Sequence, residues 1–336
     1  RVIAMTALVK IISGKYRGSK LENVTLPMHR PVVEGAKGDF VTVNATELLG
    51  TEFGKIRVQV DEYEYVGDGQ MTESAVKVET DEEIIARIED RFEILNEMTR
   101  ATVNGNVRAM VVVGPPGVGK SYGVEKELEE SGLLDDLAGR PRKYEVVKGA
   151  ITPIGLYCKL FEYSDRNNVL VFDDCDSVLG DELSLNILKA ALDSGKKRTI
   201  HWNADSHKLR NEGVPNKFAF HGSVIFITNI KFDNVRSAKI KDHLEALMSR
   251  CHYLDLTLDT MRDKYLRIKQ IARTGALFDG YKMDAQDESE ILQYMKQNDT
   301  RLREMSLRMA IKLADLRRMS PGRWMSIAEN TCMKTR

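Results

Sequence analysis

One segment of the sequence has the residue types needed to hold phosphate groups. Residues 114–121 fit the pattern G-x-x-x-x-G-K-[ST]. Glycines let backbone N–H groups wrap phosphate oxygens, and a helix that follows presents its positive end to negative charge. Lys120 would reach the β and γ phosphates of a nucleotide, and Ser121 would ligate Mg²⁺. The residues predicted to bind ATP are Gly114, Pro115, Pro116, Gly117, Val118, Gly119, Lys120, Ser121 and Tyr122.

A pair of carboxylates supplies the second half of such a site. Asp173 and Asp174 follow the apolar run 169–172, which is typical of a buried strand. The carboxyl end of such a strand lies at the sheet edge where ligands of open α/β sheets bind. We predict that Asp173 holds Mg²⁺ through its water shell and that Asp174 polarises the attacking water. The alternative is that one or both aspartates only cap the next helix.

The elements around these residues alternate between strand and helix, which predicts a parallel sheet covered on both faces. Strands are expected at 108–113, 143–148, 168–173 and 223–228, and helices at 119–130, 153–164, 181–194 and 238–248. Further helices are expected at 259–274, 284–298, 301–317 and 321–330. The first 70 residues alternate with period two, and glycines at 14, 18, 35, 38, 50 and 54 are expected in turns.

The predicted domains are therefore a small all-β domain at 1–70, a linker at 71–80, an α/β nucleotide-binding domain at 81–256 and an α-helical domain at 257–336. The chain has 336 residues, of which 42% are hydrophobic and 30% charged, as in soluble globular proteins. Its formal net charge is zero, so no overall field favours nucleic acid or membrane.

The cysteines and histidines indicate no further chemistry. Cys158, Cys175, Cys251 and Cys332 form no C-x-x-C pair, and the histidines show no metal-ligand spacing with them. No apolar run approaches the ~20 residues that span a bilayer. We therefore expect a reducing, intracellular and cytoplasmic location with no membrane partner.

Over residues 80–330 the chain resembles the AAA+ ATPases. Lys120 and Asp173 match the Walker A and Walker B motifs of that family. Residues 223–229 look like the next strand, which ends in the sensor 1 residue, here Asn229. The resemblance implies a P-loop parallel sheet with helices on both faces, a C-terminal α-helical lid and, in this chain, a small N-terminal all-β, barrel-like domain.

Two arginines acquire roles from the same resemblance. Met248-Ser249-Arg250-Cys251 is similar to the Ser-Arg-Cys of clamp loaders, so Arg250 is expected to be an arginine finger that acts on a neighbouring subunit. The alternative is a surface arginine that pairs with a carboxylate. Residues 305–310 look like the start of the helix that carries sensor 2, with Arg308 as the best match and Arg303 in reserve.

The chain departs from the family at Asp174, where most active members have glutamate. Aspartate is shorter by ~1 Å, and catalysis is sensitive to misplacement on that scale. The resemblance still implies an ATPase and hydrolase that forms a homo-oligomer, as a six-membered ring or spiral.

Two segments are candidates to line the central channel of such an oligomer. Residues 148–157 lack the aromatic-hydrophobic-glycine triplet of protein unfoldases, and Tyr157 is expected in the core. Residues 195–222 are predicted to form a hairpin between 198–202 and 217–220, whose tip carries His207, Lys208 and Arg210. The hairpin either follows a phosphate backbone or is a solvent-exposed elaboration with Trp202 packed on the sheet.

The N-terminal segment 9–24 loosely resembles a KOW motif, found in small SH3-like barrels that contact nucleic acid or ribosomal partners. Its basic cluster is Lys10, Lys15, Arg17 and Lys20, although Gly14 and Gly18 would also shape a plain hairpin. A barrel that docks a protein partner is an equal alternative.

Three functions follow from these features. The first is an oligomeric ATPase that moves or remodels nucleic acid or a nucleoprotein complex. The second is a remodeller of a protein partner recruited by the β domain. The third is a weakly hydrolysing, ATP-gated scaffold.

Overall fold

The computed structural model describes residues 8–16, 19–35, 38–44, 55–66, 79–195, 197–230, 232, 235, 237–275 and 277–334. The chain divides into two compact units, Arg1–Thr80 and Asp81–Arg336, which are treated separately below. Most of the predicted linker, residues 71–78, lies outside the described residues.

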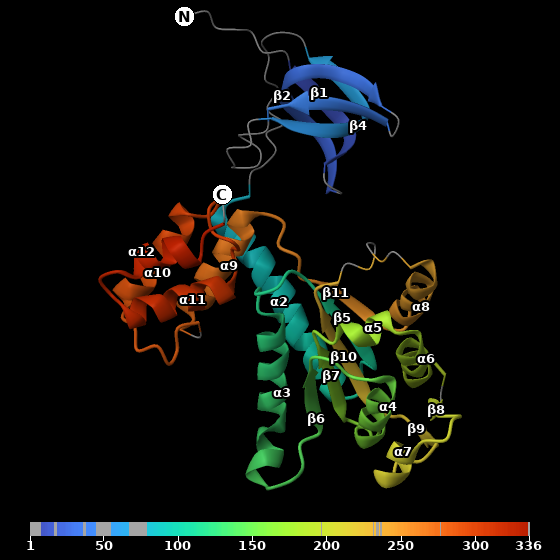
Figure 1. Ribbon diagram of the computed structural model, residues 1–336. Coiled ribbons are helices and arrows are strands. Elements are labelled where there is room, and N and C mark those ends of the chain that lie inside the picture. The colour runs from blue at the N-terminus through green and yellow to red at the C-terminus, as the bar shows by residue number, and fades with distance from the viewer. Residues whose placement is uncertain are drawn as a thin grey trace, which may run out of the picture. The chain divides into compact units, whose positions relative to one another are not determined.

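The first unit is a closed antiparallel barrel (Figure 1). Its strands are β1 (Leu8–Tyr16), β2 (Ser19–Gly35), β3 (Gly38–Val43) and β4 (Ile56–Val66), and β1 pairs with both β2 and β4. Alternate residues point inward because side chains in strands alternate between faces. The interior is made of Val9, Ile11, Val24, Leu26, Val41, Val43, Ile56, Val58 and Val60. The predicted all-β barrel is confirmed, whereas its likeness to a KOW domain stays a prediction.

Glycines in this barrel have two different roles. Gly35 ends β2 and Gly38 begins β3, and the two residues pair with each other. The prediction of a turn at Gly14 was wrong, because Gly14 lies inside β1 where its pairing with β4 shifts register. A Cβ at Gly14 would lie 2.5 Å from the Gln59 carbonyl oxygen, so the glycine allows two backbones to approach. Gly18, Gly50 and Gly54 lie outside the described residues.

The second unit is built on a five-stranded parallel sheet. Its order is β11 (His252–Asp255), β5 (Ala109–Val113), β10 (Ser223–Thr228), β7 (Val169–Asp173) and β6 (Tyr144–Lys148). Every residue of β5, β7 and β10 is buried, as expected for strands covered on both faces. The strands β5, β6, β7 and β10 were predicted. The edge strand β11 was not, because its four residues carry no apolar pattern, and three of them are exposed.

Helices cover both faces of this sheet (Figure 1). One face packs against α4 (Pro153–Glu162), α5 (Asp176–Gly180), α6 (Glu182–Ala191) and α8 (Ala238–Met248). The other packs against α2 (Asp81–Val103) and α3 (Lys120–Leu137). The predicted α/β fold class is therefore confirmed.

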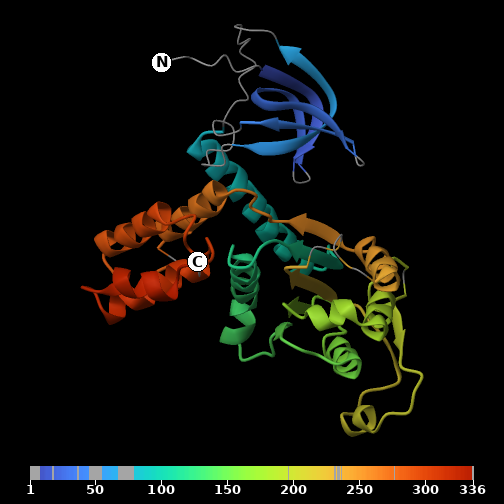
Figure 2. The same ribbon diagram turned by 45° about the horizontal axis from the view of Figure 1, so that its top comes forward.

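The sequence 195–222 forms an insertion before β10. Strands β8 (Thr199–His201) and β9 (Lys217–Ala219) pair antiparallel, as predicted, and α7 (His207–Asn211) lies between them. Figure 2 shows this insertion projecting from the α/β layers on the side away from the C-terminal helices.

The C-terminal helices enclose a core of their own. They are α9 (Met261–Arg273), α10 (Ala285–Gln297), α11 (Leu307–Met319) and α12 (Trp324–Thr331), packed around Met295, Leu313 and Trp324. Helix α11 begins at Leu307 rather than at the predicted residue 301. Ser306 sets this start, because its side chain accepts a 3.1 Å hydrogen bond from the Met309 amide. No helix among the described residues is long and apolar enough to cross a membrane.

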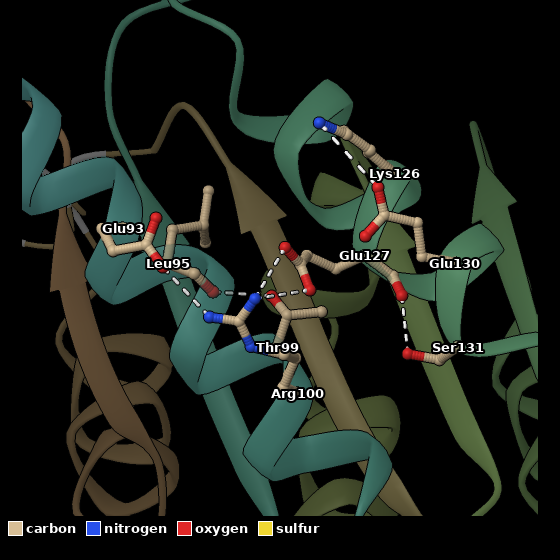
Figure 3. Close-up of polar contacts among 8 residues, drawn as sticks. All are labelled: Glu93, Leu95, Thr99, Arg100, Lys126, Glu127, Glu130 and Ser131. Carbon is tan, nitrogen blue, oxygen red and sulfur yellow. Dashed lines mark hydrogen bonds and ion pairs between the residues drawn. The ribbon is translucent and has the colours of Figure 1, made fainter.

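An ion-pair network joins α2 to α3, the helix that follows the phosphate loop (Figure 3). Arg100 Nη1 lies 3.3 Å from both carboxylate oxygens of Glu127, and Nη2 lies 3.0 Å from Glu93 Oε1. The Glu127 side chain is 8% exposed, whereas that of Arg100 is 47% exposed. Hydrogen bonds to Glu93 and the charge of Glu127 raise the pKa of Arg100. The exposed guanidinium thus neutralises a carboxylate that is almost fully buried.

We predict that Arg100→Ala lowers the melting temperature by more than Glu127→Gln, because only the first change leaves a buried carboxylate without its cation. Thermal unfolding followed by circular dichroism measures both. Lys126→Ala, which removes an exposed partner 3.9 Å from Glu130, is the matched control and should change stability by less than ~0.5 kcal/mol. An equal loss from Lys126→Ala would contradict the prediction.

Candidate nucleotide-binding site

The loop at residues 114–119 connects β5 to α3, in the context that the motif requires. Gly117 and Gly119 have φ angles of 73° and 101°. Residues other than glycine rarely adopt such positive φ angles. The loop also contacts the start of α11: the Leu307 amide donates a 2.9 Å hydrogen bond to the Gly117 carbonyl. A Cβ at Gly117 would lie 2.7 Å from Ser306 Cβ. The loop is therefore fitted closely against the C-terminal helices.

Lys120 is buried and is held by three oxygen acceptors. Its Nζ donates to the carbonyl oxygens of Gly114 and Pro115 at 2.7 and 3.0 Å and to Asn229 Oδ1 at 2.8 Å. Burial lowers the pKa of Lys120, and the charges of Asp174 and Asp173 partly oppose this. A buried ammonium group surrounded by carbonyl oxygens is suited to exchange them for phosphate oxygens.

Ser121 and Asp173 bring the two halves of the site together. Ser121 Oγ donates a 2.9 Å hydrogen bond to Asp173 Oδ1, and Lys148 Nζ lies 3.6 Å from Oδ2. Burial raises the pKa of the Asp173 carboxyl, while the bond from Ser121 lowers it. A hydroxyl and a carboxylate are the hard oxygen ligands that Mg²⁺ takes when it keeps several waters. The described residues contain no cluster of three or more histidine, cysteine or acidic side chains suited to a metal ion.

Asp174 and Asn229 extend this network at the ends of β7 and β10. Asn229 Nδ2 donates a 2.9 Å hydrogen bond to Asp174 Oδ1, while its Oδ1 accepts from Lys120. Only this orientation of the amide serves both partners. Asp174 has a φ of 52°, and its amide donates to the Ile227 carbonyl at 2.9 Å. A non-glycine residue with positive φ is uncommon and clusters at functional sites.

A cavity of about 260 Å³ opens in front of these groups. Asp174, Asn229, Arg308 and the phosphate loop line its polar end. Its apolar wall comes largely from the C-terminal helices and the connection between two of them. The wall consists of Ile271, Leu277, Leu307 and Ile311. Sequence reasoning missed these four residues. In the sequence Ile271, Leu307 and Ile311 look like parts of ordinary helix cores, and Leu277 lies between two predicted helices, so no signal marks them. Tyr122 also lines the cavity, whereas Val118 packs in the core beneath the loop.

The predicted arginines are placed differently. Arg308 is exposed and lines the cavity, and its charge also lowers the pKa of Lys120. Arg303 Nε instead donates to the Met333 carbonyl at 2.9 Å, away from the cavity lining. Arg250 follows α8 and does not line the cavity of its own chain. Its Nη1 donates to the Ala246 carbonyl, and its buried Nε has no partner among the described residues.

The β8–β9 insertion joins the core at its base. Trp202 packs on Tyr157 with ring centroids 5.5 Å apart, and the Tyr157 hydroxyl donates to the Pro215 carbonyl at 2.9 Å. Tyr157 is fully buried, as predicted. At the tip, Arg210 lies 3.0 Å from Asp205 and Lys208 3.8 Å from Glu212. Exposed carboxylates therefore lie beside both Lys208 and Arg210 at the tip.

The parallel sheet, the phosphate loop with its paired aspartates and the C-terminal helices define a P-loop fold of the AAA+ type. The chain belongs to the family of the uncharacterized 36.7 kDa protein in the nrdC–mobD intergenic region of Enterobacteria phage T4. The two are 34% identical over 284 residues, which is 82% of this chain and 86% of the phage protein. No model of a known protein family matches the chain.

Solved structures resemble the chain more remotely. NtrX from Brucella abortus with ATP gives a TM-score of 0.42 at 13% identity, over 76% of this chain and 53% of NtrX. ORC1 from Aeropyrum pernix with DNA gives a TM-score of 0.40 at 15% identity, over 72% of this chain and 60% of ORC1. DnaA with AMPPCP and single-stranded DNA gives a TM-score of 0.39 at 13% identity, over 71% of this chain and 63% of DnaA. The chain thus spans less than two thirds of each, and its fold is assigned from its own topology and loop.

We predict that Gly117→Ala weakens ATP binding by about tenfold or more, because the new methyl group must displace either the loop or Ser306. Titration with a fluorescent ATP analogue measures the affinity. Gly139→Ala is the matched control, since Gly139 has a similar φ of 64° but no atom within 4 Å of an added Cβ. Both changes cost ~1–2 kcal/mol of backbone strain. Equal nucleotide affinities of the two variants would show that the contact with Ser306 has no role.

Proposed function

We propose that this chain binds Mg²⁺ and ATP in the cavity beside Lys120 and hydrolyses the ATP. The observation that carries the proposal is the hydrogen bond between Ser121 and Asp173, which joins the phosphate loop to the buried strand β7. The loop, its lysine, a hydroxyl, two carboxylates and an amide meet at one edge of the sheet. This donor set fits a hydrated magnesium ion and a triphosphate.

Each side chain has a defined task in this proposal. Lys120 would exchange its carbonyl partners for β- and γ-phosphate oxygens. Ser121 and Asp173 would hold the magnesium ion. Magnesium, when bound, neutralises charge that develops on the phosphates. Asp174 accepts a proton from, or orients, the attacking water. Asn229, already bonded to both Lys120 and Asp174, positions the carboxylate relative to the γ-phosphate. The apolar wall at Ile271, Leu277 and Ile311 suits the base of the nucleotide.

Arg308 and Arg250 differ in the subunit on which they act. Arg308 lines the cavity of its own chain and contributes its charge in cis. Arg250 does not line that cavity, so its proposed role as an arginine finger requires a neighbouring subunit. The proposal therefore includes a homo-oligomer, as a hexameric ring or spiral.

We propose nucleic acid or a nucleoprotein complex as the substrate. The observation that favours it over a threaded protein is the complete burial of Tyr157, the aromatic residue of segment 148–157, which is therefore not available to grip a polypeptide. A protein partner recruited through the β barrel and an ATP-gated scaffold remain the two competing functions.

We predict that Asp174→Asn binds ATP normally but loses turnover by about 10²–10⁴-fold, because asparagine tolerates positive φ yet cannot accept the proton. Arg250→Ala should lose about a thousandfold or more, because it removes the finger. A mixture of the two inactive variants should regain activity, since Arg250 of one subunit then meets an intact Asp174 of another. Steady-state phosphate release measures all three samples.

Arg308→Ala is the control for this mixing experiment. Arg308 lines the same cavity as Asn229, so an Asp174→Asn subunit cannot supply it to an Arg308→Ala site. That mixture should remain inactive. If the Arg250→Ala mixture also remains inactive while each protein binds ATP, the finger does not act between subunits.

We predict that single-stranded DNA or RNA raises the turnover of the wild-type protein, because a motor couples hydrolysis to its substrate. Phosphate release is measured with and without oligonucleotides at several protein concentrations, with Lys120→Ala as the inactive reference. Turnover that is unaffected by nucleic acid favours the protein remodeller. ATP-dependent assembly with negligible turnover favours the scaffold.

A further inference from the structure

A second polar cavity, of about 270 Å³, lies at the opposite edge of the same sheet. Arg108 precedes β5, Asn167 precedes β7 and Ser223 begins β10, so the cavity faces the amino ends of these strands. Arg166, Arg198 and His221 complete what we call the amino-edge pocket. Strands of five residues separate it from the phosphate loop by roughly 15 Å. No carboxylate is among the described residues that line it.

Arg198 forms the floor of the amino-edge pocket. The residue is 8% exposed, and its Nη1 donates to the carbonyl oxygens of Ala191 at 3.3 Å and Gly222 at 3.2 Å. Its Nε and Nη2 have no hydrogen-bond partner within the part of the chain that the structure describes. Burial, assisted by the charge of Arg108, lowers the pKa of Arg198 to about 10, so the group remains cationic at neutral pH. Its Cζ lies over the Phe220 ring, 5.4 Å from the ring centroid. The Nε and Nη2 donors are not enclosed by protein, so they are available to an anion in the cavity.

The two arginines at the rim have no carboxylate partner among the described residues. Arg108 Nη1 donates to the backbone carbonyl of Asp193 at 3.1 Å, and the Asp193 carboxylate accepts from the Gly195 amide instead. Neither Arg108 nor Arg166 forms an ion pair with any residue that the structure describes. The tip of the insertion differs in this respect, because Arg210 is paired with Asp205. Three like charges around one cavity repel one another unless an anion joins them.

Backbone hydrogen bonds fix the walls of the amino-edge pocket. The His221 amide donates to the Ser164 carbonyl at 2.7 Å, and the Ser223 amide donates to Asn168 at 2.8 Å. The Val224 amide donates to the Arg108 carbonyl at 2.9 Å. These bonds tie the loop after α2, the loop before β7 and the base of the insertion together. The arginines are thus carried by a preformed frame rather than by a loose surface.

We propose that the amino-edge pocket binds a phosphate group, and that the backbone of a nucleic-acid strand supplies it. Guanidinium forks match phosphate oxygens in paired hydrogen bonds, and phosphate offers acceptors on several sides to arginines that converge. The pocket lies at the base of the β8–β9 insertion. The phosphate chemistry stands independently of ATP hydrolysis, whereas the nucleic-acid source rests on the substrate class proposed above.

The test measures binding in the full-length Lys120→Ala protein, so that hydrolysis plays no part. Fluorescence anisotropy gives the affinity for a labelled single-stranded oligonucleotide, and calorimetry gives that for pyrophosphate. Arg108→Gln and Arg166→Gln alter exposed side chains, which leaves folding intact. Each is expected to weaken oligonucleotide binding by about tenfold or more. Each should also reduce the slope of log affinity against log salt by about 0.7.

Lys208→Gln and Arg210→Gln at the insertion tip are the matched controls. They should change neither the oligonucleotide affinity nor its salt dependence. Arg198→Lys keeps the buried charge but loses the fork, and it should weaken binding as Arg108→Gln does. Pyrophosphate binding that depends on Arg108 and Arg198, with unchanged oligonucleotide binding, would overturn nucleic acid as the source. The proposal as a whole is overturned if no pocket variant changes either affinity, or if only the tip variants do.

Discussion

The burial of β5, β7 and β10 on both faces is the constraint on which the remaining structure depends. These three strands contain apolar residues at almost every position, because helices cover them from both sides. Polar side chains can therefore gather only where the strands begin and end. At the carboxyl edge this brings together Asp173 and Asn229 beside Lys120, and at the amino edge it brings together Arg108 and Ser223. The two polar cavities at opposite edges of the sheet are consequences of one packing arrangement.

The C-terminal helices complete the first of these sites rather than merely follow it. The bond from the Leu307 amide to the Gly117 carbonyl fixes the start of α11 against the phosphate loop, and Arg308 and Ile311 on the same helix reach the cavity. A ligand in the cavity would contact both the sheet edge and α11. The contact between α11 and the loop is close at Gly117, where an added Cβ would lie 2.7 Å from Ser306 Cβ.

Sequence reasoning predicted the parts of the candidate site that depend on local chemistry. The loop, the aspartate pair and Asn229 follow directly from residue types at the ends of apolar strands, and the structure brings them within hydrogen-bonding distance. It missed the apolar wall at Ile271 and Ile311, because helix stripes that face a ligand and those that face a core have the same spacing. It missed Leu277 because a single apolar residue between two helices carries no pattern. The roles proposed for Arg250 and Arg308 came from resemblance, and no distance within one chain tests the first of them.

Sequence reasoning was also limited in predicting which basic side chains form a cluster. In the sequence, Lys208 and Arg210 stand out as a basic tip, whereas Arg108, Arg166 and Arg198 are separated by up to 90 residues and form no visible cluster. In the structure Asp205 and Glu212 lie beside the tip residues, whereas the three distant arginines line one cavity that has no carboxylate among its described lining residues. Local sequence therefore overstates basic runs whose counter-charges lie nearby. The surface available to an anion is set by the residues that the strand order brings together.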